Sequence, residues 1–493
     1  MAREIKTETS KTFMEFRLLP RLTTKGHAPD SIDLKASLTR SGLCLNIPLT
    51  SAVMQSVSGP ELAIALAREG GISFIFCSQP IEDQAEMIRK VKTYKAGFVV
   101  SDSNLSPEQT LRDVLELTEK TGHSTIPVTD DGSPEGVLMG MITDMDYWPT
   151  DDPDTKVKDI MTPIDSLAYG EDGISLKEAN EILRKAKKSC IPILDKKRLK
   201  YLVFKKDYLM HKSYPLELLD EEKRLMVGAG INTRDYKERV PALHESGCDV
   251  LVVDTSDGYS EYVSDTIKWV KKNYPDLPVG AGNVVTAEGF RYLADAGADF
   301  VKVGIGGGSI CITQEQKGIG RGQASALSGV VAARDEYKKK TGEYVPICSD
   351  GGLVQDSNIL MSLAFGADFV MMGRYFARFR ESPTPIKEMN GKQVKPYWGE
   401  GSERARNWQR YYTGGGTSLK FEEGVDGFVS FSGTLKDNVE KTLAVIKSTM
   451  GNIGCKDIPE LHDEAIIEPM STASIREGKA HDIMLHEDDR ISW

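Results

Sequence analysis

The sequence predicts an α/β protein built on a closed barrel of eight parallel strands, interrupted by one inserted module. Three observations lead to this prediction: eight short apolar runs with helical patterns between them, glycine or polar residues where those runs end, and one long internal repeat. Eight is the number of parallel strands that closes a (β/α)8 barrel, or TIM barrel. Continuous apolar runs are typical of strands that are buried on both faces.

Most of the expected strands are short runs rich in β-branched and aromatic residues. Helical patterns lie between the runs, for example at Pro60–Arg68, Asp235–Ser246 and Ala287–Ala296. The expected strands are Ile47–Met54, Gly71–Phe76, Leu225–Ile231, Val250–Asp254, Pro278–Asn283, Phe300–Ile305, Val345–Asp350 and Phe369–Arg374. Because barrel enzymes place their chemistry at the carboxyl ends of the strands, we expect the functional site there.

A long insertion, about residues 95–213, separates the second expected strand from the third and contains an internal repeat. Ser124–Asp130, which reads STIPVTD, is echoed by Ser189–Asp195, which reads SCIPILD. Ile142–Asp146 is likewise echoed by Val203–Asp207. A repeat of this length predicts two similar supersecondary units within the insertion.

An amphipathic helix is expected before the first strand of each unit, over Thr110–Thr121 and Leu176–Lys187, with Val157–Pro163 as the linking segment. This arrangement resembles a pair of cystathionine-β-synthase (CBS)-type modules, also called a Bateman domain, which in many proteins binds adenine nucleotides. A compact pair that binds nothing is the alternative, because a fold alone does not determine function.

Residues 391–422 are rich in Gly, Arg, Tyr and Trp and show no clear periodicity. A long segment without secondary structure of its own is uncommon unless it is functional. We interpret it as a mobile flap over the mouth of the barrel. The catalytic barrel is then expected in two parts, residues 1–94 and 214–493, and the second part carries the flap and a C-terminal segment.

Composition excludes several classes of function. The 493 residues are 40% hydrophobic and 27% charged, which is ordinary for a soluble enzyme. A formal net charge of −11 argues against nucleic acid as the primary partner. The chain has no apolar run long enough to span a bilayer and no secretory signal, so we expect a cytoplasmic protein without a membrane partner. Seven scattered cysteines without a Cys-x-x-Cys pair fit free thiols in a reducing compartment.

Residues 304–313, GIGGGSICIT, are the most informative stretch of the chain. Glycines allow backbone N–H groups to approach an anion and permit turns with positive φ. A lone cysteine is usually a small buried hydrophobe, but the glycine-rich loop around Cys311 favours a reactive thiol. The loop follows the sixth strand and does not read G-x-G-x-x-G, so a Rossmann site is not supported. The pairing of glycines and thiol predicts covalent chemistry on a nucleotide.

The next two strand ends strengthen this prediction. Asp350–Gly352 and Gly373–Arg374 follow the seventh and eighth strands, where barrel loops often hold a phosphate. Together with the glycine loop they form a predicted phosphate grip, with the Asp350 carboxylate within reach of a ribose diol. The alternative for Asp350 is a helix-cap or turn aspartate.

Five motifs resemble those of the inosine-5′-monophosphate (IMP) dehydrogenase family, in the same order and over almost the whole chain. They are GIGGGSICIT at 304–313, SDGG at 349–352, MMGR at 371–374, YWGEGSERARNWQRY at 397–411 and FEEGVDG at 421–427. The inserted repeat also resembles that family's regulatory module. The resemblance implies a cytoplasmic homotetramer that oxidises IMP to xanthosine monophosphate (XMP) with NAD as cofactor, and adenine or guanine nucleotides as ligands of the insertion.

The resemblance also implies a role for each matching residue. Cys311 looks like the nucleophile, Thr313 like its loop partner, and Arg410–Tyr411 like the pair that activates water. The residues that would contact the substrate are Met54, Ser309, Asp350, Gly351, Gly352, Gly373, Arg374, Tyr397, Gly399, Glu400, Gly401 and Glu423. Those that would contact NAD are Arg234, Asp254, Tyr262, Asn283 and Gly304.

The chemistry implied by the resemblance makes opposite demands on water. Addition of the Cys311 thiolate to carbon 2 of the base allows hydride to leave, and the resulting thioimidate must then be hydrolysed. The first step excludes water and the second requires it, which a moving flap would resolve. An arginine base is unusual because its reference pKa lies far above neutrality. The alternative is that Arg410 acts as an electrostatic clamp while Thr313 and Glu423 relay the proton.

A monovalent cation such as K⁺ is also implied by the resemblance. The carbonyl groups of Gly306, Gly308 and Cys311 would hold it, together with a neighbouring subunit's residues Glu477, Gly478 and Lys479. The family commonly has Glu-Gly-Gly in that segment, whereas this chain has a lysine at position 479. Because an ammonium group can crowd or replace the cation, we predict weak or absent activation by potassium.

Two other functions remain as alternatives. Guanosine monophosphate (GMP) reductase resembles the same barrel, loop and cysteine, but it usually lacks the inserted repeat and uses no Arg–Tyr pair. A nucleotide-sensing regulatory protein with an inert barrel is the second alternative. The inserted repeat and Arg410–Tyr411 favour the dehydrogenase over the reductase, and the presence of Cys311 and Arg410–Tyr411 favours it over the regulatory protein.

Overall fold

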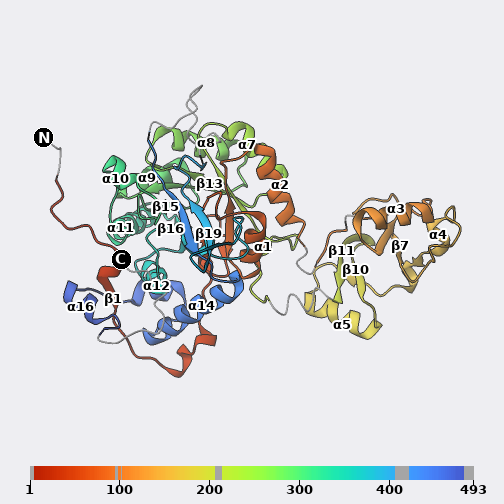
Figure 1. Cartoon of the computed structure of the whole chain (residues 1–493). Helices are drawn as coiled ribbons and strands as arrows, with labels where there is room; N and C mark the ends of the chain where they lie inside the picture. Colours follow the sequence, from red (N-terminus) through yellow and green to blue (C-terminus); the bar gives the residue numbers. More distant parts are fainter. Residues whose placement is uncertain (1–4, 95–97, 102, 206–213, 406–420, 482–493) are drawn as a thin grey trace. The chain divides into compact units, whose positions relative to one another are not determined.

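The computed structural model of the chain describes residues 5–94, 98–101, 103–205, 214–405 and 421–481 (Figure 1). The chain divides into two compact units. The first combines Met1–Lys92 with Met226–Trp493, and the second is Thr93–Leu225. The second unit contains the expected insertion, 95–213, and is longer at both ends. Within the described residues, no helix is long and apolar enough to cross a membrane.

Eight parallel strands close into a barrel in the order β12-β13-β14-β15-β16-β17-β4-β5. Their bounds are β4 Leu49–Ser51, β5 Ile72–Ile75, β12 Gly228–Ile231, β13 Val250–Asp254, β14 Val279–Val284, β15 Val301–Val303, β16 Ile347–Asp350 and β17 Phe369–Met372. Each strand lies inside its predicted run, except that β14 continues one residue further. The expected (β/α)8 barrel is therefore confirmed.

Helices cover the outside of the barrel (Figure 1). The helices that follow the barrel strands, including the short α10 at the pocket, are α1 Pro60–Arg68, α2 Ile81–Lys92, α7 Tyr236–Glu245, α8 Glu261–Asn273, α9 Ala287–Ala296, α10 Thr313–Lys317, α11 Gln323–Thr341, α12 Asp356–Ala364 and α13 Arg374–Ala377. Local sequence sets their ends, as α9 shows. The Thr286 side chain accepts a hydrogen bond from Gly289 N at its start, and Gly297 at φ +103° ends it. Predicted and observed bounds agree for α1 and α9.

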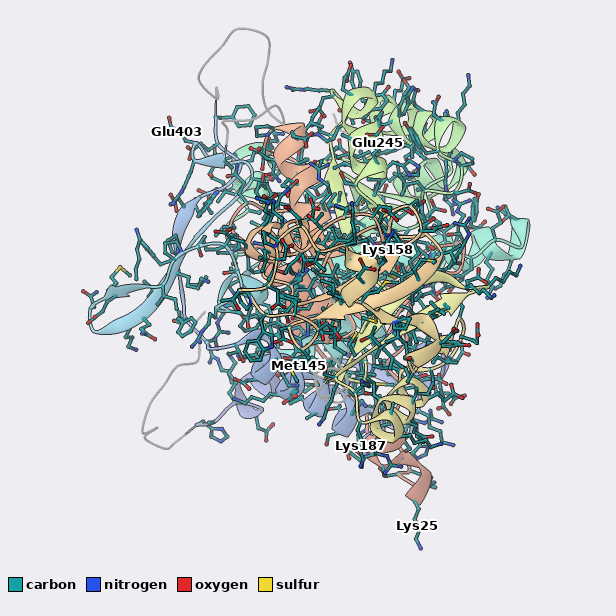
Figure 2. All side chains as sticks on the ribbon, turned by 90° about the vertical axis from the view of Figure 1, so that its right-hand side faces the viewer. Lys25, Met145, Lys158, Lys187, Glu245 and Glu403 are labelled. Carbon is teal, nitrogen blue, oxygen red and sulfur yellow. The ribbon has the colours of Figure 1, made fainter. Side chains whose placement is uncertain are left out.

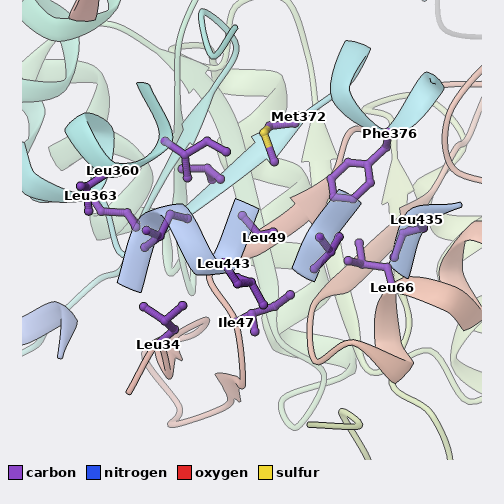
Figure 3. Packing of buried hydrophobic residues seen from close by; sticks show 14 of the residues in the cluster. Leu34, Ile47, Leu49, Leu66, Leu360, Leu363, Met372, Phe376, Leu435 and Leu443 are labelled. Carbon is purple, nitrogen blue, oxygen red and sulfur yellow. The ribbon is translucent and has the colours of Figure 1, made fainter. Parts of the chain in front are cut away.

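A large apolar core joins the barrel wall to the carboxyl-terminal helices (Figure 3). Leu49 of β4 and Met372 of β17 pack there with Leu363 of α12 and Leu443 of α14 (Leu435–Asn452). Burial of each such side chain contributes about 1.5–3 kcal/mol to folding. Because Met372, the last residue of β17, is buried in this core, the start of the following loop at Gly373 is held in place.

Short elements complete the first unit. β1 (Phe16–Leu18) pairs antiparallel with β21 (Ile467–Pro469) and so ties the amino-terminal segment to the carboxyl-terminal one. The helices α15 (Ile458–Glu464) and α16 (Thr472–Glu477) flank β21 in the sequence. This pairing places residues 467–469 beside residues 16–18.

The expected flap, 391–422, is not without secondary structure. A three-stranded antiparallel sheet consists of β18 Lys387–Met389, β19 Lys392–Trp398 and β20 Asp426–Ser430. Asn390 and Gly391, both at positive φ, form the two-residue turn of the β18–β19 hairpin, which projects from the barrel in Figure 2. Val394 to Tyr397 of β19 are all buried, so this strand does not alternate between buried and exposed residues. The sequence pattern therefore does not indicate a strand here. Residues 406–420 lie outside the described residues.

The second unit has two halves of similar construction. One half has the sheet order β6-β7-β8 and the other β11-β10-β9. Their strands and helices are α3 Leu111–Thr121, β6 Thr125–Thr129, β7 Leu138–Thr143, α4 Val157–Ile160, β8 Thr162–Pro163, β9 Gly170–Glu171, α5 Leu176–Ala186, β10 Cys190–Asp195 and β11 Arg198–Phe204. Each half has its own apolar core, and a third cluster that includes Leu138 and Leu199 joins them. The repeat in the sequence thus corresponds to two like halves in the structure.

Candidate active site

A pocket lies at the carboxyl ends of the barrel strands, where the sequence predicts the functional site. Asp254 ends β13, Asp350 ends β16, and Gly304 and Gly373 directly follow β15 and β17. Sixteen residues singled out in the sequence line this pocket: Met54, Asp254, Asn283, Gly304, Gly306, Gly308, Cys311, Thr313, Asp350, Gly351, Gly373, Tyr397, Gly399, Glu400, Gly401 and Glu423.

Other predicted residues lie elsewhere. The described residues that do not line the pocket are Ser309, Gly352, Arg374, Arg234, Tyr262, Glu477, Gly478 and Lys479. Ser309 and Gly352 are close behind it, because Ser309 is hydrogen-bonded to Tyr397 and Gly352 N donates to Gly307 O at 2.9 Å. Tyr262 is 74% exposed on α8. Arg410 and Tyr411 lie outside the described residues, so their predicted role stays a prediction.

The loops after β15 and β16 pack backbone to backbone. A Cβ on Gly304 would lie 2.1 Å from Asp350 O, so this position accepts no side chain. A Cβ on Gly351 would lie 3.2 Å from Gly308 N, and Gly351 and Gly352 both have positive φ. Glycine loops of this kind let backbone N–H groups approach an anion without interference from a Cβ. The geometry therefore supports the predicted phosphate grip.

Cys311 is half-buried on the loop between β15 and α10. Its Sγ is 3.2 Å from Thr313 Oγ1, and Thr313 Oγ1 donates to Glu423 Oε2 at 3.1 Å. The second carboxylate oxygen of Glu423 is 2.7 Å from Lys317 Nζ. The thiol therefore begins a chain of polar groups that runs through Thr313 to a carboxylate, which can carry a proton.

Three other cysteines in the described part of the chain are buried thiols with raised pKa values. Burial raises the pKa of Cys248 to about 12 and that of Cys455 to about 11, so neither thiol ionises near neutral pH. The same cause raises the pKa of Cys348 well above its ordinary value.

The described residues contain no group of three or more His, Cys, Asp or Glu side chains that could hold a metal ion.

Lys302 is the principal pocket residue that the sequence analysis missed. It is fully buried on β15, and its Nζ lies 2.7 Å from Asp254 Oδ1 and 2.9 Å from Asp350 Oδ2. Burial disfavours the ammonium form, but the charges of Asp254 and Asp350 outweigh it and raise the pKa of Lys302. A lysine between two valines of a buried strand was the available signal, because buried lysines are almost always paired.

The pocket also contains an unsatisfied acceptor that fits NAD. Asn283 Nδ2 donates to Asp350 Oδ2 at 2.9 Å and to Gly304 O at 2.6 Å. Its Oδ1 is buried and has no hydrogen-bond partner among the described residues. Because an unpaired buried acceptor is costly, this oxygen is suited to an amide donor such as the carboxamide of nicotinamide.

Glu400 connects the end of β19 with the loops after β4 and β5. Its carboxylate accepts from Gln55 N at 2.6 Å and from Ser78 Oγ at 2.5 Å. Trp398 Nε1 donates to Gln55 Oε1 at 3.0 Å. These hydrogen bonds attach residues 398–400, within the predicted flap, to the barrel. Glu403 follows shortly after them in the sequence and is labelled in Figure 2.

Comparisons with known proteins identify the family. The family profile "IMP dehydrogenase / GMP reductase domain" matches residues 10–481. The IMP dehydrogenase of Tritrichomonas foetus is 55% identical over 98% of both chains, and that of Aquifex aeolicus is 37% identical over 99% of both. A GMP reductase of Trypanosoma brucei, solved with guanosine 5′-monophosphate, has a TM-score of 0.81 and 30% identity over 97% of this chain and 98% of its own. The chain therefore belongs to the IMP dehydrogenase / GMP reductase family.

Proposed function

We propose that this protein is an IMP dehydrogenase, an NAD-dependent oxidoreductase that converts IMP to XMP through a covalent adduct on Cys311. The observation that carries the proposal is the position of the Cys311 thiol, beside the glycine loops and hydrogen-bonded to Thr313. The 55% identity to an IMP dehydrogenase over the full length supports it.

In this proposal the residues of the chain hold IMP and exclude water from its base. The glycine loops and Tyr397 bind the phosphate, and Asp350 accepts hydrogen bonds from the ribose. The Cys311 sulfur adds to carbon 2 of the base, which becomes sp³ and loses hydride to leave a thioimidate. NAD⁺, when bound by Asp254 and Asn283, supplies the acceptor for that hydride. Water then adds to carbon 2, the C–S bond breaks, and XMP leaves with the thiolate regenerated.

Two routes can remove the proton from the attacking water. The Arg410–Tyr411 pair is the first, as the family resemblance implies, and both residues are outside the described part of the chain. The second route is the described chain from Thr313 to Glu423, whose atoms are already within hydrogen-bond distance. We assign the principal role to Arg410 and keep Thr313 and Glu423 as the secondary relay.

Replacement of Arg410 by alanine tests this assignment. We expect steady-state turnover to fall about 10²–10⁴-fold, as for loss of a general base, while the first turnover stays fast. One NADH per active site should then form in a burst, and mass spectrometry should detect the nucleotide adduct on Cys311. The matched control is Arg291→Ala, which removes an exposed ion pair with Glu336. Steady-state turnover at the wild-type rate in R410A would contradict the assignment.

GMP reductase is the remaining alternative, and the inserted module does not decide between the two activities. The GMP reductase of Trypanosoma brucei aligns with 97% of this chain, so the insertion alone does not separate the two enzymes, even if GMP reductases usually lack it. Sequence identity favours the dehydrogenase, at 55% against 30%. Absorbance of reduced nicotinamide decides directly: it should rise with IMP and NAD⁺, and a fall with GMP and NADPH instead would establish the reductase.

We also propose that activation of turnover by potassium is weak or absent. Glu477, Gly478 and the exposed Lys479 do not line the pocket of their own chain, and Gly478 lies near Arg17, so we infer that a neighbouring subunit supplies this segment to the loop at Gly306. The Lys479 ammonium would then take the place of the cation. Replacing potassium chloride by tetramethylammonium chloride should leave the rate unchanged, and K479G should gain activation by potassium. Strong potassium dependence of the wild type would refute this.

The remaining proposals rest on the family. The need for a neighbouring Glu477–Lys479 segment supports a homotetramer. The two like halves of the second unit support adenine or guanine nucleotide ligands there, and we propose a cytoplasmic location. Equilibrium titration of the full chain with ATP and GTP tests the nucleotide assignment, and sedimentation tests the tetramer.

A further inference from the structure

A buried lysine behind the pocket joins the strand that carries Tyr397 to the segment that begins at Gly373. Lys395 lies on β19 and is fully buried. Its Nζ donates to the carbonyl oxygens of Phe379 at 2.6 Å, Ser382 at 3.0 Å and Arg380 at 3.4 Å. An ammonium group has three donors and is costly to bury unless they are used. Here every donor has a backbone carbonyl within reach.

Lys395 and Tyr397 lie against opposite ends of α13. Side chains two residues apart on a strand point to the same face, so both project from β19 toward this helix. Gly373 is the residue before α13, and a Cβ placed on it would lie 2.6 Å from Tyr397 Oη. Phe379, the nearest acceptor of Lys395, lies two residues past the last helical residue, Ala377. One strand therefore holds both ends of the helix.

We propose that Lys395 is a positioning residue for the phosphate of the substrate. By fixing the turn after α13 to β19, its ammonium group keeps Gly373 and Tyr397 Oη at the spacing that the phosphate grip requires. The inference rests on the proposed function in one respect, namely that a phosphate ester occupies the pocket. It assigns to Lys395 no contact with the substrate, because the side chain is buried behind Tyr397 and is not part of the pocket wall.

The surroundings of Lys395 make this positioning sensitive to pH. The charged side chain that faces it is Glu381 of the same turn, whose Oε2 accepts from Leu435 N at the start of α14. Arg378 donates instead to the end of β20 and the residues after it. Burial lowers the pKa of Lys395 to about 8, against the smaller opposing effect of Glu381. Above that pH the neutral amine has two donors for three carbonyls, so the turn is held less firmly.

Ribose 5-phosphate is the probe that tests the proposal. It carries the phosphate and ribose of IMP but no base, and its phosphate stays a dianion above about pH 7. Its binding to the full-length chain, without NAD, is measured by isothermal titration calorimetry between about pH 7 and pH 9.5. At neutral pH we expect K395M to bind about tenfold more weakly than wild type, the equivalent of one lost hydrogen bond to a charged group. Wild-type affinity should fall above about pH 8, and the fall should be smaller in K395M, because only the wild type also loses the positive charge of Lys395.

Lys92→Met is the matched control. Lys92 is also buried, and its Nζ pairs with Asp249 at 2.7 Å, away from the pocket. K92M should lose thermal stability but bind ribose 5-phosphate as wild type does, with the same fall above about pH 8. Equal loss of affinity in K92M and K395M would overturn the proposal, because any buried lysine would then have the same effect.

The remaining outcomes separate this proposal from the proposed function. If wild type binds ribose 5-phosphate and K395M binds it equally well at neutral pH, Lys395 has no positioning role. If wild type does not bind it, the phosphate grip fails, and the assignment of the substrate fails with it. If K395M does not fold, the wild-type pH dependence decides, and an affinity that stays constant to about pH 9.5 overturns the proposal.

Discussion

Replacement of Cys311 by alanine is expected to abolish the oxidation of IMP, with a loss of about 10⁴-fold or more in kcat, as for other covalent nucleophiles. The reason is that no hydride can leave carbon 2 until a nucleophile has added to it. NADH formation measured by absorbance gives the rate. Binding of IMP should persist, because the glycine loops at Gly304 and Gly351 do not depend on the thiol.

A second cysteine provides the control for this prediction. Cys44 is also half-buried, but it lies at the start of β3 (Cys44–Leu45), and its Sγ lies 3.5 Å from Gly42 O. C44A should therefore keep wild-type turnover. Undiminished turnover in C311A would remove the covalent mechanism, and failure of C311A to bind IMP would show that its loss of activity is structural.

The barrel could be predicted because parallel strands buried on both faces are continuous apolar runs. Val250–Asp254 was predicted with the bounds that β13 has. The run at Phe300–Ile305 was predicted too long, since β15 ends at Val303. Gly304 has φ +142°, and a Cβ there would clash with Asp350 O, so the chain leaves the sheet at this residue. Local pattern finds a strand but not the point where a distant loop ends it.

The site could be predicted only in part, and for a related reason. Residues in motifs, such as Cys311, stand out within a few positions of the sequence. Lys302 and Lys395 do not, because their partners are remote: Asp254 is 48 residues from Lys302, and Phe379 is 16 residues from Lys395. The hairpin at Asn390–Gly391 was not predicted for a different reason. Asn-Gly is a strong signal for a two-residue turn, and the burial of both faces of β19 concealed it.

Lys302 is the residue whose loss should affect both substrates at once. Its ammonium lies between Asp254, assigned to the NAD ribose, and Asp350, assigned to the IMP ribose. K302M removes the positive charge that pairs with the buried Asp254 and the half-buried Asp350, and breaking a buried ion pair in this way costs about 3–5 kcal/mol. We expect both KM values to rise and kcat/KM to fall about 10³-fold, from steady-state kinetics with IMP and NAD⁺ varied in turn.

A buried ion pair at the opposite end of the barrel separates function from stability in this test. Arg334 lies 3.4 Å from Asp368, which precedes β17, and both are buried. R334M should lower the melting temperature as K302M does, yet leave both KM values unchanged. A rise in the KM of only one substrate in K302M would show that Lys302 serves a single carboxylate. Equal effects on both would mean that one buried charge organises the two nucleotide sites together, because Lys302 pairs with both Asp254 and Asp350.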